Sequence, residues 1–340
     1  MQSQKKRLRH LMAEGNYPNP MRPANTFVTI RSMKIVILDG HTLNPGDNPW
    51  DAVAELGELV IYDYTSPERV VERSLDADIA VTNKAVFSAE AIGKLPKLKF
   101  IAVTATGYNI VDIAAARARG IPVSNVPEYS TDSVAQFVAA LILELAHRVA
   151  YHSDMVHAGK WSKQQVFCFW DTPQIELKDK TLAIIGYGKI GHRVGEIAEA
   201  LGMKIITAGR DMAKVREVVA QADVVTFHCP LTDANKGIVN RELLSLMKPT
   251  AFLINAARGG LVVEQDLADA LNDGVIAGAA VDVVSIEPIQ PDNPLLKAKN
   301  CIITPHIAWA SLAARQRLMQ ATADNIKAFQ AGKPVNVINS

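Results

Sequence analysis

The chain has 340 residues, of which 49% are hydrophobic and 21% are charged, and its formal net charge at pH 7 is +1. This length exceeds the size at which one hydrophobic core stops growing, so it predicts two domains. The near-neutral charge argues against a nucleic-acid-binding protein. Basic residues gather in residues 1–32, whose net charge is +5 against −4 for the rest. We expect this segment to be a poorly ordered extension.

Cysteine use and hydropathy exclude two further classes of protein. Cys168, Cys229 and Cys301 form neither a disulfide framework nor a C-x-x-C pair, so we expect no metal site and a reducing, cytoplasmic location. The longest apolar stretch, residues 134–149, is interrupted by polar side chains and is too short to span a bilayer. The N-terminus lacks the apolar core of a secretory signal. We therefore expect no membrane partner.

From Met33 onward, short runs rich in β-branched residues alternate with helical stretches. Ser88 is a candidate N-cap for a helix over 89–95, and Gly120 is a candidate C-cap for a helix over 109–119. The strands expected in this half span 34–38, 59–62, 79–82 and 100–103. Because strands and helices alternate, the pattern predicts a parallel sheet with right-handed crossovers.

The second half begins with an apolar helix expected over 131–149, which we interpret as buried against another domain or subunit. Alternation then resumes after an aromatic stretch, and a final helix over 311–331 stops at Gly332. The strands expected here span 181–185, 204–208, 224–227, 252–255, 275–278 and 301–304. This second run of strands and helices predicts another parallel α/β unit.

The strand over 181–185 runs into Gly186-x-Gly188-x-x-Gly191 and then into a helix. In this context the motif predicts a dinucleotide-binding loop, in which Gly186 makes the turn and Gly188 lets the backbone approach a pyrophosphate. Gly191 allows the helix to pack closely on the strand, and the helix N-terminus faces the phosphates. The alternative is a plain strand–helix turn.

The next strand ends in Gly209-Arg210-Asp211 instead of the acidic residue that grips a ribose 2′-hydroxyl in NAD-binding proteins. A missing carboxylate at Gly209 and a cation at Arg210 favour the 2′-phosphate of NADP(H). Asp211 weakens this argument because its carboxylate can serve NAD. The cofactor is therefore NAD or NADP, with NADP favoured.

Three polar side chains follow the ends of later strands, where open α/β sheets bind ligands: Arg258, Glu287 and His306. Taken singly, each has an interpretation without a function: Arg258 as a surface arginine, Glu287 as a solvated carboxylate and His306 as a residue at the start of a helix. Together they suit a 2-oxo acid. An arginine matches a carboxylate, a histidine delivers a proton to the carbonyl oxygen, and a carboxylate orients the histidine.

Other motifs have simpler interpretations. Residues 167–170 (Phe-Cys-Phe-Trp) could stack on a cofactor, but we favour packing beneath a hinge between domains. The adjacent His228 and Cys229 lack a second pair of metal ligands, so we do not interpret them as a zinc site.

The motifs resemble, in order, those of the D-isomer-specific 2-hydroxyacid dehydrogenase family, and within it the glycerate dehydrogenase/hydroxypyruvate reductase group. The resemblance extends from Met33 to the C-terminus. It rests on residues 105–109, 125–127, 133–136, 186–191, 228–232, 255–260, 282–287 and 305–308.

This resemblance implies an α/β fold in which a Rossmann-type cofactor domain is inserted into a flavodoxin-like substrate domain. The substrate domain would comprise 33–130 plus 310–340, and the dinucleotide-binding domain 131–309. It also implies a homodimer formed through the helix near 131–150.

The resemblance implies roles for individual residues. The catalytic group would be Arg258, Glu287 and His306. The substrate would contact Arg258, the backbone around Thr106 and Gly107, and the side chains of Tyr108 and Trp309. The cofactor would contact Gly186, Tyr187, Gly188, Lys189, Ile190, Gly191, Gly209, Arg210, His228, Cys229, Pro230, Ala256 and Asp282.

The sequence therefore predicts an NAD(P)-dependent oxidoreductase that interconverts a small 2-oxo acid and its D-2-hydroxy acid. Hydroxypyruvate/D-glycerate is the first expectation and glyoxylate the second. One alternative is a nicotinamide-binding, corepressor-like module, because fold alone does not fix function. Another is a dehydrogenase of a different small anion: 3-phosphoglycerate, formate or phosphite.

Overall fold

The computed structural model describes residues 32–340, so the expectation of a poorly ordered extension falls outside the described residues, apart from Ser32. Five parallel strands form the first sheet, in the flavodoxin-like order β2-β1-β3-β4-β5. They are β1 (Lys34–Ile37), β2 (Glu58–Ile61), β3 (Ile79–Thr82), β4 (Phe100–Val103) and β5 (Val123–Ser124). Strands β3 and β4 are buried throughout, which accounts for their unbroken apolar sequences.

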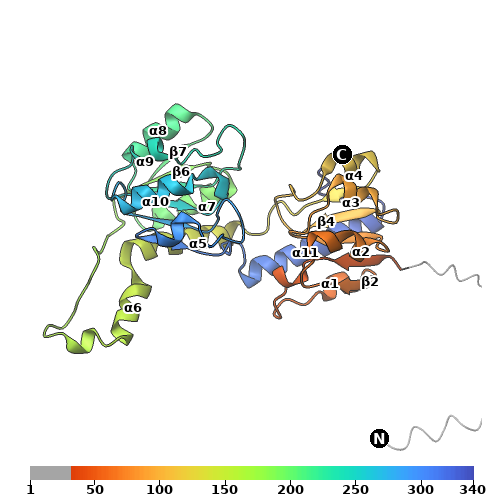
Figure 1. Ribbon diagram of the computed structural model, residues 1–340, viewed down its shortest axis with the longest axis horizontal. Coiled ribbons are helices and arrows are strands. Elements are labelled where there is room, and N and C mark those ends of the chain that lie inside the picture. Colours follow the sequence, from red (N-terminus) through yellow and green to blue (C-terminus); the bar gives the residue numbers. More distant parts are fainter. Residues whose placement is uncertain (1–31) are drawn as a thin grey trace, which may run out of the picture. The chain divides into compact units, whose positions relative to one another are not determined.

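Short helices and the last helix of the chain cover the first sheet (Figure 1). They are α1 (Asp51–Ala54), α2 (Val70–Ser74), α3 (Ala89–Gly93), α4 (Ile113–Ala118) and α11 (Leu312–Gln330). Leu318 and Ile326 of α11 share a buried cluster with Ile35 of β1. The C-terminal part of the chain thus returns to the first sheet, and the segment between β5 and α11 forms an insertion.

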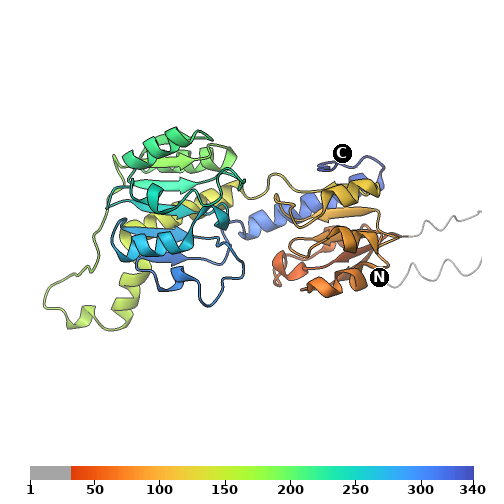
Figure 2. The same cartoon turned by 45° about the horizontal axis from the view of Figure 1, so that its top comes forward.

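The inserted segment builds a second parallel sheet with helices around it (Figure 2). Its strand order is β11-β10-β9-β8-β6-β7. Its strands are β6 (Thr181–Ile185), β7 (Lys204–Ala208), β8 (Val224–Phe227), β9 (Phe252–Asn255), β10 (Gly278–Val281) and β11 (Cys301–Ile303). The strand order changes direction between β6 and β8, and such a switch point opens a crevice beyond the carboxyl ends of the strands.

Helices cover both faces of the second sheet. They are α5 (Thr131–His147), α7 (Lys189–Ala200), α8 (Met212–Gln221), α9 (Arg241–Leu244) and α10 (Glu264–Asn272). Alternate residues of β6 face opposite sides: Ile184 packs in the cluster with α5 and α7, and Ile185 in the cluster with α8 and α10. The predicted fold class is confirmed, and the exact boundaries of the two domains stay a prediction.

The apolar helix expected over 131–149 is interrupted. Arg148 adopts a left-handed conformation with φ 50°, and the chain continues as α6 (Val149–His157). The axes of the two helices are bent by 57° relative to each other. In the described residues no single helix is long and apolar enough to cross a membrane, and only this bent pair, taken together, has the length and composition of a membrane span. Helix α5 is buried along α7 of the same α/β unit, so the expectation that another domain or subunit buries it stays a prediction.

The strand expected over 275–278 is wrong, because β10 begins only at Gly278. Gly274 has φ +70°, and the N–H of Val275 donates to the carbonyl of Ala270 at 2.8 Å. Val275 thus belongs to the end of α10, in the manner of a glycine-capped helix. Because β10 runs from Gly278 to Val281, Asp282 is the first residue after the carboxyl end of the strand.

The aromatic residues near 167–170 are not packed beneath a hinge, contrary to expectation. Phe167 is 88% exposed and Trp170 is 66% exposed. Figure 1 shows α6 and the chain that follows it extending away from the second sheet. Among the described residues, these two side chains therefore lack enough neighbouring atoms to bury them.

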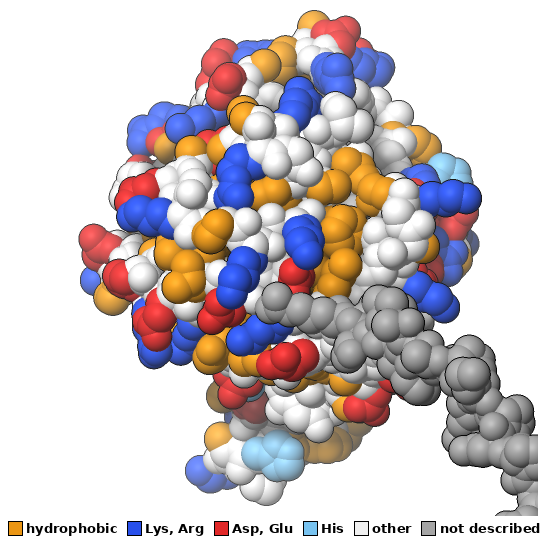
Figure 3. All heavy atoms as spheres, turned by 90° about the vertical axis from the view of Figure 1, so that its right-hand side faces the viewer, with side chains coloured by type: hydrophobic (Ala, Val, Ile, Leu, Met, Phe, Trp, Pro, Cys, Tyr) orange, Lys and Arg blue, Asp and Glu red, His pale blue; other side chains and the backbone are white. Residues whose placement is uncertain are grey.

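Short 3₁₀ turns complete the described elements: Gly40–Thr42, Pro67–Arg69, Trp161–Lys163, Gly259–Leu261 and Pro294–Lys297. On the face of the molecule shown in Figure 3, Lys and Arg side chains lie among Asp and Glu side chains. That face therefore presents charges of both signs.

Candidate active site

The glycine-rich loop after β6 has three glycines with different requirements. Gly186 has φ +95°, and a Cβ there would lie 2.7 Å from the backbone nitrogen of Cys229. A Cβ at Gly191 would lie 2.3 Å from the carbonyl oxygen of Gly186, so this glycine lets α7 pack on the loop. Gly188 precedes α7, and no described atom lies within 4 Å of its Cβ position. A tight turn, an open approach and a close helix are what a bound pyrophosphate requires, so the loop fits a dinucleotide.

The end of β8 faces this loop across the switch point. Thr226 Oγ1 lies 3.0 Å from Nε2 of His228. Burial lowers the pKa of His228 to about 4, so its imidazole is neutral at pH 7. This neutral side chain and the backbone of Cys229 form the wall opposite Gly186.

Two of the predicted cofactor residues in the loop already have neighbours in the protein. The ring of Tyr187 lies against His192, with 5.4 Å between ring centroids, and Tyr187 remains 45% exposed. Lys189 forms an ion pair with Glu128, which lies on the segment between β5 and α5. Both groups of this pair are more than half exposed, so solvent weakens their attraction.

The end of β7 bears on the choice between NAD and NADP. Asp211 is the N-cap of α8, and its Oδ1 accepts the backbone N–H of Ala213 at 2.9 Å. This carboxylate is thus engaged in capping the helix. Within residues 32–340, the guanidinium of the exposed Arg210 makes no hydrogen bond or ion pair. Arg210 is therefore the group at this strand end that is available to an anion.

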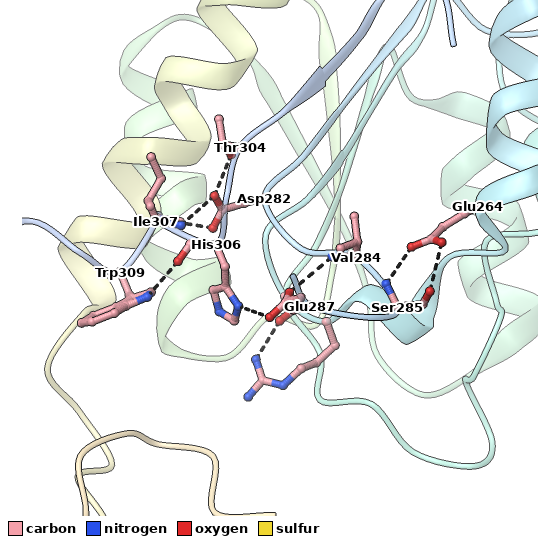
Figure 4. Close-up of polar contacts among 12 residues, drawn as sticks. Glu264, Asp282, Val284, Ser285, Glu287, Thr304, His306, Ile307 and Trp309 are labelled. Atoms are coloured by element: carbon pink, nitrogen blue, oxygen red, sulfur yellow. Dashed lines mark hydrogen bonds and ion pairs between the residues drawn. The ribbon is translucent and has the colours of Figure 1, made fainter. Parts of the chain in front are cut away.

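His306 and Glu287 form the central polar pair of the site (Figure 4). Nδ1 of His306 lies 2.7 Å from Oε2 of Glu287, and each side chain is 33% exposed. Burial alone would raise the pKa of the Glu287 carboxyl. The hydrogen bond and charge of His306, the Val284 N–H and the charge of Lys84 lower this pKa, and together they outweigh the effect of burial. The net pKa lies below its usual value, so the carboxyl is ionised at neutral pH.

Asp282 holds the segment that carries His306. Its Oδ1 accepts hydrogen bonds from the Thr304 hydroxyl at 2.6 Å and the Ile307 N–H at 2.9 Å, and its Oδ2 accepts the Ala308 N–H at 2.9 Å. His306 itself has φ 56°, a left-handed conformation that is uncommon for a residue with a side chain. Asp282 is 1% exposed, so its carboxylate acts as a buried anchor that keeps this turn in place.

Arg258 follows β9 and is exposed towards the same region. Its Nη1 donates to the carbonyl of Ala257 at 2.7 Å. A Cβ at Gly107 would lie 3.3 Å from Nη2 of Arg258, so the backbone after β4 runs beside this guanidinium. A cation thus stands next to the backbone of the Thr106–Gly107 turn.

These groups surround one cavity of about 660 Å³, a size typical of ligand sites. Of the predicted site residues, its lining contains Thr106, Gly107, Gly188, Lys189, Ile190, His228, Cys229, Pro230, Ala256, Arg258, Asp282, Glu287, His306 and Trp309. The remaining ones are outside the lining: Tyr108, Gly186, Tyr187, Gly191, Gly209 and Arg210. Gly186 and Gly191 still shape the cavity by fixing the loop, whereas Tyr108 is 43% exposed and lies between two lining residues, Gly107 and Asn109.

The cavity also contains residues that sequence reasoning missed. Lys84 follows β3, and its charge acts on Glu287; the buried Asp39 fixes its turn by accepting N–H groups of Asn83, Lys84 and Ala85. Because Lys84 directly follows a parallel strand, its position in the sequence could have indicated a site residue. Tyr129 packs edge-on against Trp309, with 6.2 Å between ring centroids, and only tertiary contacts reveal it. Trp309 is fixed further by donating from Nε1 to the carbonyl of His306 at 2.9 Å.

In the described residues, no group of three or more His, Cys, Asp and Glu side chains is arranged to hold a metal ion. A doubly wound sheet with a dinucleotide loop, facing a cavity with an arginine and a paired histidine, defines a nicotinamide-dependent oxidoreductase. Comparison with known proteins makes this class more specific.

The model of the D-isomer specific 2-hydroxyacid dehydrogenase NAD binding domain matches residues 139–308. Hydroxypyruvate reductase from Blautia hydrogenotrophica is 50% identical over 321 residues, which cover 90% of this chain and all of that protein. Glycerate dehydrogenase from Methylorubrum extorquens is 41% identical, with 90% and 99% covered. The chain therefore belongs to the D-isomer specific 2-hydroxyacid dehydrogenase family, as its motifs predicted.

Solved structures agree with this assignment. The TT0316 protein from Thermus thermophilus superposes with a TM-score of 0.79 at 31% identity, covering 90% of this chain and all of that one. An NADPH-dependent glyoxylate/hydroxypyruvate reductase from Sinorhizobium meliloti, solved with NADP and malonate, gives 0.77 at 26% identity, with 90% and 97% covered. The protein is thus an NAD(P)-dependent D-2-hydroxyacid dehydrogenase.

Proposed function

We propose that the physiological reaction is the interconversion of hydroxypyruvate and D-glycerate, with glyoxylate as a second substrate. The observation that carries this proposal is the 50% identity to a hydroxypyruvate reductase along the whole length of that protein. The cavity supports it chemically, because it combines the Arg258 cation with the His306–Glu287 pair. A small anion with a neighbouring carbonyl group matches both features.

We assign the substrate carboxylate to the Arg258 guanidinium and the backbone around Thr106 and Gly107. Binding there directs the substrate carbonyl towards His306, which gives its proton to the carbonyl oxygen during reduction and accepts it during oxidation. Glu287 fixes the ring through Nδ1 and stabilises the charged form of the imidazole. Trp309, fixed by the His306 carbonyl, bounds the substrate pocket.

When bound, the nicotinamide ring donates or accepts the hydride at the substrate carbon. We assign the cofactor's pyrophosphate to the loop from Gly186 to Gly191, and its adenosine side to Tyr187 and the segment 228–230. The segment around Ala256 and Asp282, which lines the cavity, would hold the nicotinamide end. Since both carboxylate oxygens of Asp282 are engaged with residues 304–308, we give it mainly the role of holding that segment.

We propose NADP(H) as the preferred cofactor. The support comes from Gly209, which leaves open space, and from Arg210, which is exposed without a described partner. Asp211 is already the N-cap of α8, which weakens the argument for NAD. The Sinorhizobium meliloti relative is described as NADPH-dependent.

We propose that the protein is a cytoplasmic homodimer with small-molecule partners and no nucleic-acid or membrane partner. The exposed apolar side chains on α6 and after it, including Tyr151, Trp161 and Phe167, supply a surface that a second copy would bury. Light scattering of the purified protein tests this assembly, and a monomer at micromolar concentration would contradict it.

A panel of 2-oxo acids assayed with NADH and with NADPH tests the proposed reaction. It should contain hydroxypyruvate, glyoxylate, pyruvate and phosphohydroxypyruvate, together with the reverse assays of formate and phosphite. We expect the highest kcat/KM for hydroxypyruvate with NADPH. Cofactor binding without turnover of any member would favour the corepressor-like alternative instead.

A further inference from the structure

The segment that carries Glu287 is held by a second carboxylate, that of Glu264 at the first position of α10 (Figure 4). Oε1 of Glu264 accepts the backbone N–H of Ser285 at 2.6 Å, and Oε2 accepts the Ser285 hydroxyl at 3.0 Å. Oε2 also accepts Nδ2 of Asn293 at 2.9 Å. Three donors from residues 285–293 thus converge on one side chain.

These contacts connect directly to the catalytic pair. Ser285 follows Val284, whose N–H donates to Oε1 of Glu287 at 3.3 Å, while the other oxygen of Glu287 faces His306. A shift of the backbone at Ser285 therefore changes how the Glu287 carboxylate is oriented.

The same segment is enclosed from its other side by Gly259, the residue after Arg258. A Cβ there would lie 1.9 Å from the carbonyl oxygen of Val284 and 2.5 Å from the nitrogen of Ser285. The backbone at 284–285 thus lies against Gly259, while Glu264 holds Ser285 by hydrogen bonds. Gly259 and Glu264 thus hold the segment that carries Glu287 at two points.

We infer that Glu264 is a positioning residue for the Glu287–His306 pair, an inference that rests on the proposed function of that pair. Glu264 is absent from the cavity lining and acts through Ser285 and Val284. The hydrogen bonds of Glu264 go to Ser285 and Asn293, and none goes to Arg258, so we expect its loss to affect the chemical step more than substrate binding.

The test compares Glu264→Ala, Glu264→Gln and the matched control Asp266→Ala. Asp266 lies in the same first turn of α10 and also accepts a backbone N–H, but from Arg241 at 2.9 Å, away from the site. We expect Glu264→Ala to lower kcat about 10- to 100-fold with little change in KM for the 2-oxo acid. Glu264→Gln should recover part of the loss, because its amide oxygen can still accept the Ser285 N–H.

The pH profile and amide exchange distinguish positioning from general loss of structure. Loss of the Val284 hydrogen bond removes an interaction that lowers the pKa of Glu287, so the acidic limb of kcat/KM should move to higher pH in Glu264→Ala. Hydrogen exchange of the amides at 284–285 should become faster in both Glu264 variants and stay unchanged in Asp266→Ala.

Glu264 variants that match Asp266→Ala in kcat, acidic limb and exchange rates would overturn the inference. Should Glu264→Ala fail to fold, Glu264→Gln carries the same comparison. Inactivity of the unmodified enzyme on every 2-oxo acid would instead refute the proposed function, and the exchange rates would still decide whether Glu264 holds the segment.

Discussion

Nδ1 of His306 lies 2.7 Å from Oε2 of Glu287, although 19 residues separate the two along the chain. Each side chain is one-third exposed, so the pair is open to a ligand from the cavity. A carboxylate in this position leaves the other ring nitrogen, Nε2, free to exchange a proton with a substrate oxygen.

Glu287→Gln should lower kcat by about 100-fold, because the amide cannot stabilise the charged imidazole. The pKa of Glu287 is depressed in the folded protein, so its carboxylate is ionised above the usual value of 4.5 and is neutralised only as the pH falls below that value. The acidic limb of kcat/KM assigned to Glu287 should lie below pH 4.5 and be missing in the variant. Steady-state assays across pH, with the exposed Glu90→Gln as control, measure both effects. If the acidic limb of kcat/KM persists in Glu287→Gln, a group other than Glu287 causes it.

Gly259→Ala should destabilise the protein by about 1–3 kcal/mol, because the added methyl group requires the backbone at 284–285 to move. The same movement displaces Glu287 and should lower kcat/KM. Gly93→Ala is the matched control, since no described atom lies within 4 Å of its Cβ position. Urea unfolding of the two variants measures the difference. Equal stability of the two variants would mean that Val284 approaches Gly259 less closely than described.

The neutral His228 should make stability depend on pH. Its pKa is lowered from 6.5 to about 4 in the folded protein, so the unfolded chain binds more protons between these values. Stability is therefore fully present above pH 6.5 and is lost as the pH falls towards 4. The full shift corresponds to about 3 kcal/mol, and the partial exposure of the residue makes the expected loss smaller.

His228→Gln should flatten this pH dependence, because glutamine does not titrate. Urea unfolding at several pH values between 4 and 7 measures the slope, and the exposed His157→Gln is the control. A slope that is the same in His228→Gln and in the unmodified protein would show that other groups cause it.

Arg210→Gln should raise KM for NADPH by about 10- to 100-fold, because a hydrogen bond to a charged phosphate is lost. KM for NADH should change little, since NADH has no 2′-phosphate. Arg216→Gln on α8, whose arginine pairs with Glu242, provides a control for loss of a nearby surface charge. If KM rises equally for NADPH and NADH, Arg210 does not determine the preference for one of the two cofactors.

Much of the fold was predictable from local sequence. Buried parallel strands such as β3 and β4 have continuous β-branched and apolar residues, and the Ser88 cap accepts a helix N–H group as expected. Strand β5 has only two residues and gives no periodic signal. The error at Val275 arose because a β-branched residue in a helix cap resembles the start of a strand.

The candidate site was predictable where residues directly follow strands. Arg258 follows β9 and His306 follows β11, the two parallel strands on either side of β10, so the sheet topology places both at the same edge. The roles of Glu264 and Tyr129 depend on contacts between distant segments, which a single sequence does not encode in any local pattern.

The most direct test of the account is the steady-state reduction of hydroxypyruvate by the unmodified enzyme, His306→Gln and Arg258→Ala, followed by loss of NADPH absorbance. The account predicts turnover by the unmodified enzyme. It also predicts that kcat falls by about 100-fold or more in His306→Gln, and that the main loss in Arg258→Ala is in KM for the 2-oxo acid. Turnover that survives both substitutions largely intact would contradict it.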